Sequence, residues 1–262
     1  MKFIFAMIAF AMIGCNSTPN QKEKPAMPGA YNMLSQTVND GKKDTTYTGL
    51  QQLKIYTQDH MMYTNFNPAD SASAFGIGSY TADTGTVTEH VFYSAGDTSI
   101  NAEPVTYTLL IEKTPAGYKQ VIPEIGSPGN MVRLTEAYDS ASVAVKSPLD
   151  GAWKLIKGYT IKGKDTTANT ATQFKAYYAG HFLFGHTYAD SAKKNHTGMG
   201  YGTFAMNGNN KVKENVAVST YSQIRGQSFD IDITINGPDE FMQTITDTNG
   251  DRNVEIYQRL KK

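Results

Sequence analysis

The chain has 262 residues, and its 24 lysines and arginines balance 24 aspartates and glutamates, so the formal net charge is zero. A neutral chain without a basic stripe is not expected to bind nucleic acid, because contacts to phosphates depend on clustered positive charge. Charged residues make up only 18% of the chain while tyrosine and phenylalanine are frequent, which indicates an exported all-β protein.

The first 28 residues have the features of an export and anchoring segment. Lys2 precedes a short apolar run, residues 3–13, which is too short to cross a bilayer as a permanent helix. We therefore predict a signal peptide over residues 1–14. The stretch that ends at Cys15 resembles the lipobox of bacterial lipoproteins, in which this cysteine is lipidated. The alternative is an ordinary signal peptide with a chance cysteine.

Lipidation at Cys15 would anchor the protein in the cell envelope, with the outer membrane as the expected site. Residues 15–28 are polar and proline-rich and predict an extended tether. No acidic run follows Cys15, so we expect the protein to face the periplasm, with surface display as the open alternative. No other cysteine remains for disulfides or thiolate chemistry.

The rest of the chain contains the same domain twice. Gln52 and His60 return as Gln173 and His181, in both cases 121 residues later. The spacing drifts only across polar, glycine-rich stretches. A period of this length is far longer than a solenoid unit and indicates a duplicated domain. The predicted division is a first domain over residues 29–134, a linker over 135–150 and a second domain over 151–262.

Both copies consist of short alternating segments broken by turn residues, and neither has a helical period. Short Gly/Asn connections between sequential strands favour an up-and-down meander, and eight antiparallel strands of this length close into a small barrel. The predicted fold is all-β, with two tandem eight-stranded antiparallel up-and-down barrels. The expected strands are residues 31–38, 51–57, 60–66, 75–82, 86–94, 104–113, 117–122 and 130–134, then 152–161, 172–178, 181–187, 199–206, 211–219, 227–235, 240–246 and 253–260.

One strand in each copy carries a carboxylate on its apolar face. Alternation places Glu214 beside Val212 and Val216, and Glu89 in the matching strand of the first copy. An unpaired buried carboxylate costs several kcal/mol, so each needs a partner inside its barrel. The candidates on the same face are Gln120 and Arg133 in the first copy, and Gln243, Tyr257 and Arg259 in the second.

The predicted partners are Arg259, with Tyr257, for Glu214, and Arg133 for Glu89. Aligning the two arginines requires a three-residue deletion in the preceding loop. Such a group can anchor the head of a ligand in a cavity. It can also be an internal ion pair that closes the barrel, which we prefer because side chains alone can fill eight strands.

Lys54 and His60 recur as Lys175 and His181. The alternation does not show whether these side chains point into or out of the barrel, so they are possible site residues only. A metal site needs two or three converging ligands, and no such motif surrounds either histidine. We therefore expect no metal and no other cofactor. We interpret each of these histidines as the first residue of a strand, hydrogen-bonded to a nearby group.

His186 and His196 do not recur and are expected in loops. The Gly-x-Ser-x-Gly elbow of serine hydrolases is absent. The repeated Gly-x-Gly at Gly76 and Gly200 is typical of glycines that let a barrel strand bend. We expect no catalytic residue, and we do not expect an enzyme.

Asp70-Ser71 and Asp190-Ser191 recur in matching positions and resemble O-glycosylation signals of some Gram-negative bacteria. The same dipeptides are good turn formers, so both interpretations stay open.

Several motifs of the second copy, taken in order, resemble a family: the lipocalin-like domain of unknown function found in secreted and lipid-anchored bacterial proteins. The resemblance covers nearly all of the second copy and is looser in the first, where Tyr31 replaces the tryptophan. It implies a calycin-type barrel, with Trp153 packed at one end, and brings no established activity. The Tyr-x-Arg ending also resembles fatty-acid-binding barrels, with the order reversed. The motifs are Gly151-x-Trp153, Lys175, His181-Phe182, Gly200-x-Gly202-Thr203-Phe204, Glu214, Gln243 and Glu255-x-Tyr257-x-Arg259.

Two functions fit this sequence. The first is a lipid-anchored envelope protein that binds a small apolar or amphipathic ligand. The second is a non-catalytic structural or interaction module, with filled barrels and an apolar patch outside or between them, whose protein partner the sequence does not name. Binding predicts a cavity lined by Phe229, Ile231, Ile233, Tyr257 and Arg259.

Overall fold

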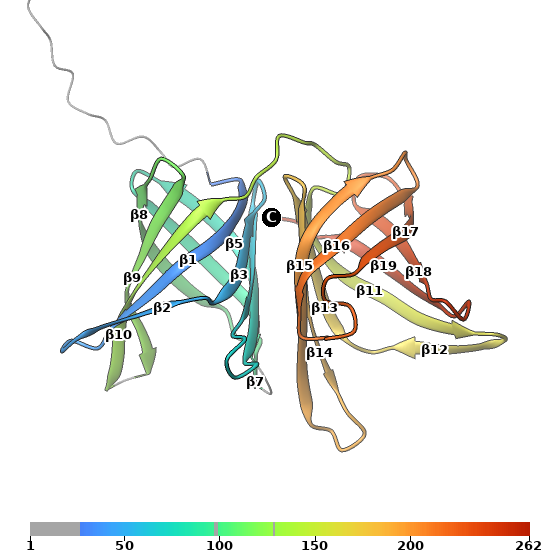
Figure 1. The fold of residues 1–262 in the computed structure, drawn as a ribbon, viewed down its shortest axis with the longest axis horizontal. Helices are drawn as coiled ribbons and strands as arrows, with labels where there is room; N and C mark the ends of the chain where they lie inside the picture. Colours follow the sequence, from blue (N-terminus) through green and yellow to red (C-terminus); the bar gives the residue numbers. More distant parts are fainter. Residues whose placement is uncertain (1–26, 97–98, 128) are drawn as a thin grey trace, which may run out of the picture.

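The computed structural model describes residues 27–96, 99–127 and 129–262. This part of the chain contains nineteen β-strands and no helix. Sixteen of them form two closed eight-stranded antiparallel barrels in tandem, which confirms the predicted fold class (Figure 1). Within these residues no helix has the length and hydropathy needed to traverse a membrane. The expected signal peptide, Cys15 and most of the tether lie outside the described residues.

Barrel 1 is an up-and-down meander that closes by antiparallel pairing of its last strand with its first. Two short strands lie outside the ring: β2 (Asp44–Thr48) pairs with the far end of the first strand, and β7 (Ser99–Asn101) pairs with β6. The ring consists of β1 (Gly29–Asn39), β3 (Gln51–Tyr56), β4 (His60–Phe66), β5 (Ser73–Asp83), β6 (Thr86–Gly96), β8 (Val105–Lys113), β9 (Gly117–Ser127) and β10 (Asn130–Ser140).

Barrel 2 repeats this topology, including the outlying hairpin strand β12 (Asp165–Asn169) on its first strand. Both hairpins fall where the sequence predicts loops, because their exposed Asp-Thr-Thr segments lack an apolar alternation. The ring consists of β11 (Gly151–Lys162), β13 (Thr172–Tyr178), β14 (His181–Ala189), β15 (Asn195–Met206), β16 (Lys211–Ser219), β17 (Ser228–Ile235), β18 (Glu240–Thr246) and β19 (Arg252–Arg259).

The last strand of barrel 1 is longer than predicted. β10 continues to Ser140, which pairs with Tyr31 on β1. Residues 135–140, expected as linker, therefore belong to barrel 1, and the connection to barrel 2 begins at Ala141.

The longer strand also corrects the alignment of the two copies. Glu136 pairs across the sheet with Gln120, as Glu255 pairs with Gln243 in barrel 2. Gln120 and Glu136 are 16 residues apart and Gln243 and Glu255 are 12 apart, so the hairpin is four residues longer in barrel 1 and not shorter as expected. Arg133 is not the counterpart of Arg259.

The repeated Gly-x-Gly motifs end at a bulge in each barrel. The register of β5 against β6 shifts at Gly78, and that of β15 against β16 shifts at Gly202. A Cβ on Gly78 would lie 2.2 Å from the His90 carbonyl oxygen, and one on Gly202 would lie 1.9 Å from the Asn215 carbonyl oxygen. Only glycine permits this close approach, in agreement with the predicted bending role.

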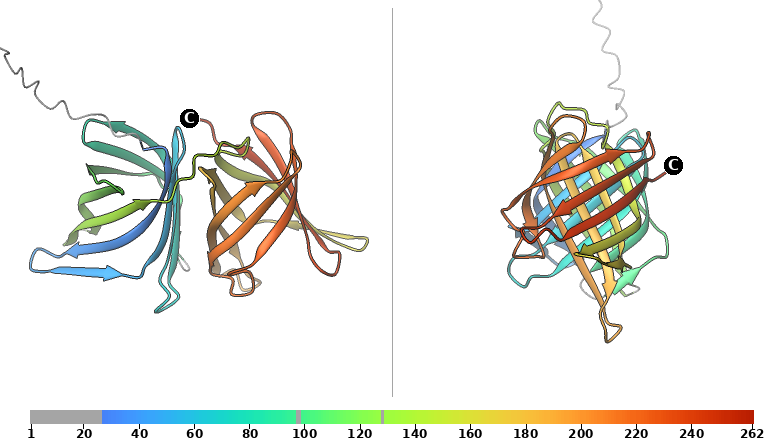
Figure 2. Two further views of the ribbon diagram at one scale, coloured as in Figure 1. Left: turned by 45° about the horizontal axis from the view of Figure 1, so that its top comes forward. Right: turned by 90° about the vertical axis from the view of Figure 1, so that its right-hand side faces the viewer.

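The two barrels pack side by side through outer sheet faces (Figures 1 and 2). β3, β4 and β5 contact β11, β13, β14 and β15. At this junction Phe75 packs directly on Gly185, where a Cβ would come within 2.3 Å of the phenyl ring. One buried apolar cluster spans both barrels: Leu53, Ile55, Met62, Phe75 and Ile77 from barrel 1, and Phe174, Ala176 and Leu183 from barrel 2.

This packing inverts the usual pattern of a barrel strand. On β3, Leu53 and Ile55 point outward into the junction, while Lys54 and Tyr56 point into the barrel and bond to its polar groups. The strand is buried on both faces, so alternation alone cannot show which face is inside.

Candidate functional site

A polar cluster crosses the interior of barrel 2. Lys175 on β13 and Glu214 on β16 form an ion pair with an Nζ–Oε1 distance of 2.8 Å. The same ammonium donates to Gln243 Oε1 at 3.1 Å and to the Tyr177 hydroxyl at 2.9 Å. The Tyr177 hydroxyl donates in turn to Glu214 Oε1. Lys175 and Glu214 are only 3% and 5% exposed, so the carboxylate predicted to be buried is buried and paired.

A second carboxylate, Glu255 on β19, extends the cluster. Its Oε2 accepts hydrogen bonds from Gln243 Nε2 at 2.7 Å and from the Tyr257 hydroxyl at 2.6 Å. Gln173 Nε2 donates to the Tyr257 hydroxyl and lies 3.4 Å from Glu255 Oε2. Gln243 thus connects the two carboxylates, because its oxygen accepts from Lys175 while its amide donates to Glu255.

The tyrosines of the cluster remain hydrogen-bond donors. Burial raises the pKa of Tyr177 well above its usual value, and the charge of Glu214 adds to the shift. Burial and the charge of Glu255 act in the same way on the pKa of Tyr257. Both phenols are therefore neutral at physiological pH, and the formal charge of the cluster, one ammonium against two carboxylates, is −1.

A cavity of about 340 Å³ lies beside this cluster. The half of the barrel nearer the linker is filled by aromatic rings, among them Trp153, Phe204 and Phe241. The cavity occupies the other half, so its wall differs from the predicted one: Phe229 and Ile231 line it, whereas Ile233, Tyr257 and Arg259 do not. Its lining consists of Gln173, Lys175, Phe184, His186, Glu214, Val216, Tyr221, Ile224, Phe229, Ile231, Gln243, Ile245, Asn253 and Glu255.

Barrel 1 contains the same polar cluster. Lys54 Nζ lies 2.7 Å from Glu89 Oε1 and 3.3 Å from Gln120 Oε1. Gln120 Nε2 donates to Glu136 Oε2 at 2.5 Å, and the Tyr138 hydroxyl donates to the same oxygen at 2.8 Å. The duplicated chain has therefore kept one lysine, two glutamates and their donors in both interiors.

The cavity of barrel 1 is smaller, about 210 Å³. The strand register places Tyr63 where barrel 2 has Phe184, and Tyr107 where it has Phe229. Gln36 also reaches into this cavity and donates to Glu136 Oε1 at 2.9 Å. Larger and more polar side chains thus fill part of the space that is open in barrel 2.

The predicted pairing of Glu214 with Arg259 is wrong. Arg259 lies at the closed end of barrel 2, where its guanidinium carbon sits 4.0 Å from the centre of the Trp153 ring. It donates to the carbonyl oxygens of Asp150 at 2.6 Å and Pro238 at 2.7 Å. Its role is to hold the linker against the barrel end, where Trp153 is buried as predicted.

The predicted pairing of Glu89 with Arg133 is also wrong. Arg133 is an exposed residue that pairs across the sheet with Asn39, far along β10 from the cluster. Lysines on β3 and β13 take the place expected for the two arginines. The possible site residues Lys54 and Lys175 are therefore the buried cations of the two interiors.

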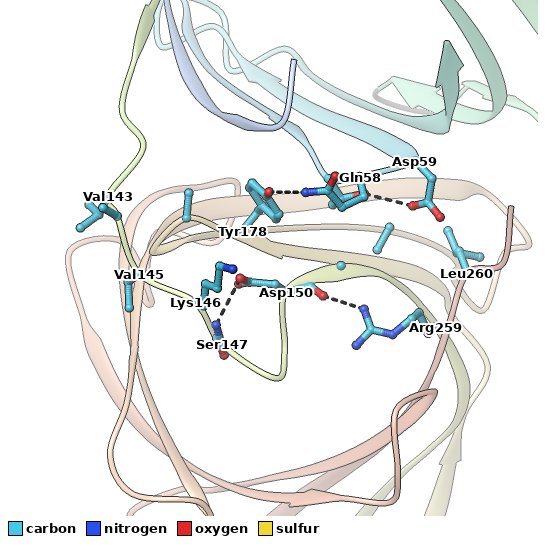
Figure 3. A pocket seen from close by; sticks show the side chains of 15 residues that line it. Gln58, Asp59, Val143, Val145, Lys146, Ser147, Asp150, Tyr178, Arg259 and Leu260 are labelled. Atoms are coloured by element: carbon cyan, nitrogen blue, oxygen red, sulfur yellow. Dashed lines mark hydrogen bonds between the residues drawn. The ribbon is translucent and has the colours of Figure 1, made fainter. Parts of the chain in front are cut away.

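A larger cleft of about 610 Å³ lies outside the barrels, between the linker and the facing ends of both (Figure 3). Gln58 crosses it to bond the Tyr178 hydroxyl at 2.9 Å. Its charged groups have both signs, and the Arg259 guanidinium is already bound to backbone carbonyls. Among the described residues of its lining, Asp150 Oδ1 is a buried acceptor without a hydrogen-bond partner.

The repeated histidines lie at strand starts, as expected. His60 Nδ1 lies 2.8 Å from Asp59 Oδ1, and His181 Nδ1 lies 3.2 Å from the Ala179 carbonyl oxygen. His186 is not in a loop, contrary to expectation: it lies in β14, lines the cavity and bonds Tyr221 through Nε2 at 2.6 Å. Burial lowers its pKa to about 4, so its ring is neutral.

His196, also expected in a loop, lies in β15 at the base of a hairpin, 2.8 Å from Asp190 Oδ2. Asp190 and Asp70 each accept a backbone hydrogen bond from the residue two positions later, as turn formers do. Within the described ranges no group of three or more acidic, histidine or cysteine residues is arranged to hold a metal ion.

Sequence reasoning missed Tyr56 and Tyr177 as members of the clusters, together with the role of Gln52 and Gln173. All four belong to the repeated Gln-x-x-x-Tyr segment around the lysine. Once the lysine is placed inside, residues two positions away must also be inside. That parity would have found them.

Comparison with known proteins adds one family. Residues 148–262 match the family described as a domain of unknown function, DUF4488. No curated protein matches. A solved structure of the vaccine antigen transferrin binding protein B, a double mutant from Haemophilus parasuis Hp5, shares 12% identity with a TM-score of 0.24. The match covers 83% of this chain and 55% of that chain. The chain is a tandem of two eight-stranded antiparallel barrels, of which the second matches a family described as a domain of unknown function.

Proposed function

We propose that the protein binds a small amphipathic or apolar ligand inside barrel 2. The observation that carries the proposal is the cavity of about 340 Å³ with a polar cluster on one side. Its volume is within the range of small-molecule sites, which are mostly apolar with a few convergent polar groups.

The cavity has an apolar wall and a polar wall. Val216, Ile224, Phe229, Ile231 and Ile245 supply apolar surface. Lys175, Glu214, Gln243 and Glu255 form the polar side, held by the hydrogen bonds described above. Burial of the apolar surface of a ligand stabilises the complex by roughly 25 cal/mol per Å². The polar side of the cavity can orient the head group of the ligand.

Barrel 1 suits the alternative role of a structural or interaction module. Its cavity is smaller, and Tyr63, Tyr107 and Gln36 occupy part of the interior. Its outer face forms half of the apolar junction with barrel 2. In this proposal barrel 1 supports and positions the binding barrel.

Anchoring in the cell envelope through lipidated Cys15 is part of the same proposal. It is supported by the position of the only cysteine directly after the apolar N-terminal run. Cys15→Ser should abolish lipid labelling and release the protein from the membrane fraction. A variant that stays with the membrane would contradict the anchor.

Native mass spectrometry of residues 27–262, purified under gentle conditions from a bacterial host, tests ligand binding. This segment contains both closed barrels and all their core clusters. We expect one bound small molecule per chain, identified by organic extraction. Ile245→Trp should fill the cavity and remove it, while the matched Ile122→Trp in barrel 1 should not. A bare mass that persists after incubation with mixed lipids would refute the proposal.

A further inference from the structure

The two barrels differ at one interior position that faces the second glutamate. Gln36 pairs with Glu136 across β1 and β10, and the equivalent pair across β11 and β19 is Gly158 with Glu255. Paired residues of an antiparallel sheet project to the same face, so residue 158 belongs to the interior. The glutamine of barrel 1 is replaced there by a residue with no side chain.

In barrel 1 the glutamate is fully satisfied by the protein. Glu136 Oε1 accepts from Gln36 Nε2 at 2.9 Å. Its Oε2 accepts from Gln120 Nε2 at 2.5 Å and from the Tyr138 hydroxyl at 2.8 Å. Both oxygens have donors, and the side chain is 6% exposed.

In barrel 2 only one oxygen is satisfied. All donors to Glu255 reach Oε2: Gln243, Tyr257 and, at 3.4 Å, Gln173. Across the described residues, Oε1 receives no hydrogen bond. Glu255 lines the cavity, so this carboxylate oxygen is an acceptor without a donor at the edge of a partly apolar space. Glu255 is half-buried and this oxygen is not sealed from solvent, so a donor on a ligand can bind it in place of water.

The cavity lining offers no free cationic group to a negatively charged ligand, and its polar side is acidic. An ammonium has three hydrogens, and Lys175 directs its own to Glu214, Gln243 and Tyr177. His186 is neutral and already bonded to Tyr221. Arg259, the residue expected to hold a carboxylate, lies outside the cavity at the closed end. With a formal charge of −1, the cluster repels an anion and attracts a cation.

We propose that barrel 2 binds a cationic amphiphile, whose protonated amine donates to Glu255 Oε1 in the place that Gln36 takes in barrel 1. The apolar part of the ligand packs against Val216, Ile231 and Ile245. This inference rests on the proposed binding function and names the ligand class that the site selects.

Three probes with the same chain length separate the head groups: octylamine, octanol and octanoate. Binding to residues 27–262 is measured by isothermal titration calorimetry at pH 7. We expect octylamine to bind at least tenfold more tightly than octanol and octanoate, because the amine supplies both the missing donor and the opposite charge. Equal affinities, or tightest binding of octanoate, would overturn the head-group inference and leave the proposed function intact. If none of the three binds, both fall.

Two variants test the acceptor itself. Glu255→Gln removes the charge with little change in shape, and Gly158→Gln introduces the barrel 1 arrangement while keeping the carboxylate. A Cβ at position 158 would lie 3.1 Å from the Cβ of the exposed Asn169, so β12 must shift by a few tenths of an ångström to admit it. Both variants should weaken octylamine binding at least tenfold and leave octanol affinity unchanged.

Gln36→Gly is the matched control in barrel 1, and it should leave octylamine binding to barrel 2 unchanged. Thermal melting verifies that each variant is folded. Unchanged octylamine affinity in folded Glu255→Gln and Gly158→Gln would contradict the assignment of Glu255 as the acceptor.

Discussion

Single side chains decide what each barrel interior can do. Lys54 and Lys175 are buried, and each ammonium is neutralised by a glutamate from a strand across the barrel. A buried ion of this kind is tolerated only with its full set of partners, which explains why the duplicated cluster was retained as a unit. Differences of one residue then separate the barrels, as at Gln36 and Gly158.

His186 predicts an acid-sensitive contribution to stability. Its folded-state pKa of about 4 is below the unfolded value of about 6.5, so the unfolded chain binds a proton that the folded one does not. The contribution is present above about pH 6.5 and is lost as the pH falls toward 4. We expect the free energy of unfolding to drop by about 2 kcal/mol over this window from His186 alone.

Urea unfolding at pH 7 and pH 4.5 measures this effect. His186→Asn places at this position the residue type that barrel 1 has at Asn65, and it should reduce the difference between the two pH values. His196→Asn, in the hairpin, is the control and should retain the difference. An unchanged pH dependence in His186→Asn would rule out this origin.

At the level of the strands, each barrel has a glycine bulge and one strand that is buried on both faces. Gly78 and Gly202 mark the same bulge in the two barrels. β3 and β13 place apolar residues outward and polar residues inward, because their outer faces form the junction. Each of these two strands therefore contributes side chains both to the interior of its own barrel and to the junction between the barrels.

Gly78→Ala and Gly202→Ala should each destabilise the protein. The added methyl would overlap a backbone oxygen that cannot move without breaking the ladder, at an expected cost of about 3 kcal/mol. Gly96→Ala is the control, because the nearest atoms to its Cβ are 3.6 Å away, and it should change stability by less than about 0.5 kcal/mol. Chemical denaturation measures all three, and equal effects would show that the bulges tolerate a side chain.

The whole molecule is a pair of barrels with unequal interiors and one shared outer core. The junction buries Leu53, Ile55, Phe174 and Leu183, so each barrel shields an apolar outer face of the other from solvent (Figure 2). The linker runs along this junction and Arg259 holds its end. The smaller cavity in barrel 1 and the larger one in barrel 2 indicate divergence of the copies after duplication.

Gly185→Leu should separate the barrels without unfolding them. The new side chain would project into the space of the Phe75 ring, which lies on the other barrel. We expect a larger radius of gyration in small-angle X-ray scattering and faster proteolysis of the linker, with an unchanged β-sheet circular dichroism spectrum. Ala217→Leu on the exposed face of β16 is the control, and it should keep the compact form. A variant as compact as the parent would show that the junction repacks.

The sequence by itself determined the two barrels. The repeat, the alternation of Phe229, Ile231 and Ile233, and the short turns predict sixteen ring strands that the structure contains, because these are local properties of the chain. The sequence also placed Glu89 and Glu214 on apolar faces, and the structure confirms that both side chains are buried. The bending role of Gly78 and Gly202 was likewise visible in the repeated motif.

Only the tertiary structure decided which residues meet inside. Strands β3 and β13 are buried on both faces, so the inward position of Lys54 and Lys175 depends on the packing of one barrel on the other. The partner of Glu214 comes from a strand 39 residues away and was misassigned to Arg259. Cavity volume depends on side chains that converge from many strands, and the open oxygen of Glu255 depends on Gly158 opposite it. These are non-local relations, and strand periodicity carries no information about them.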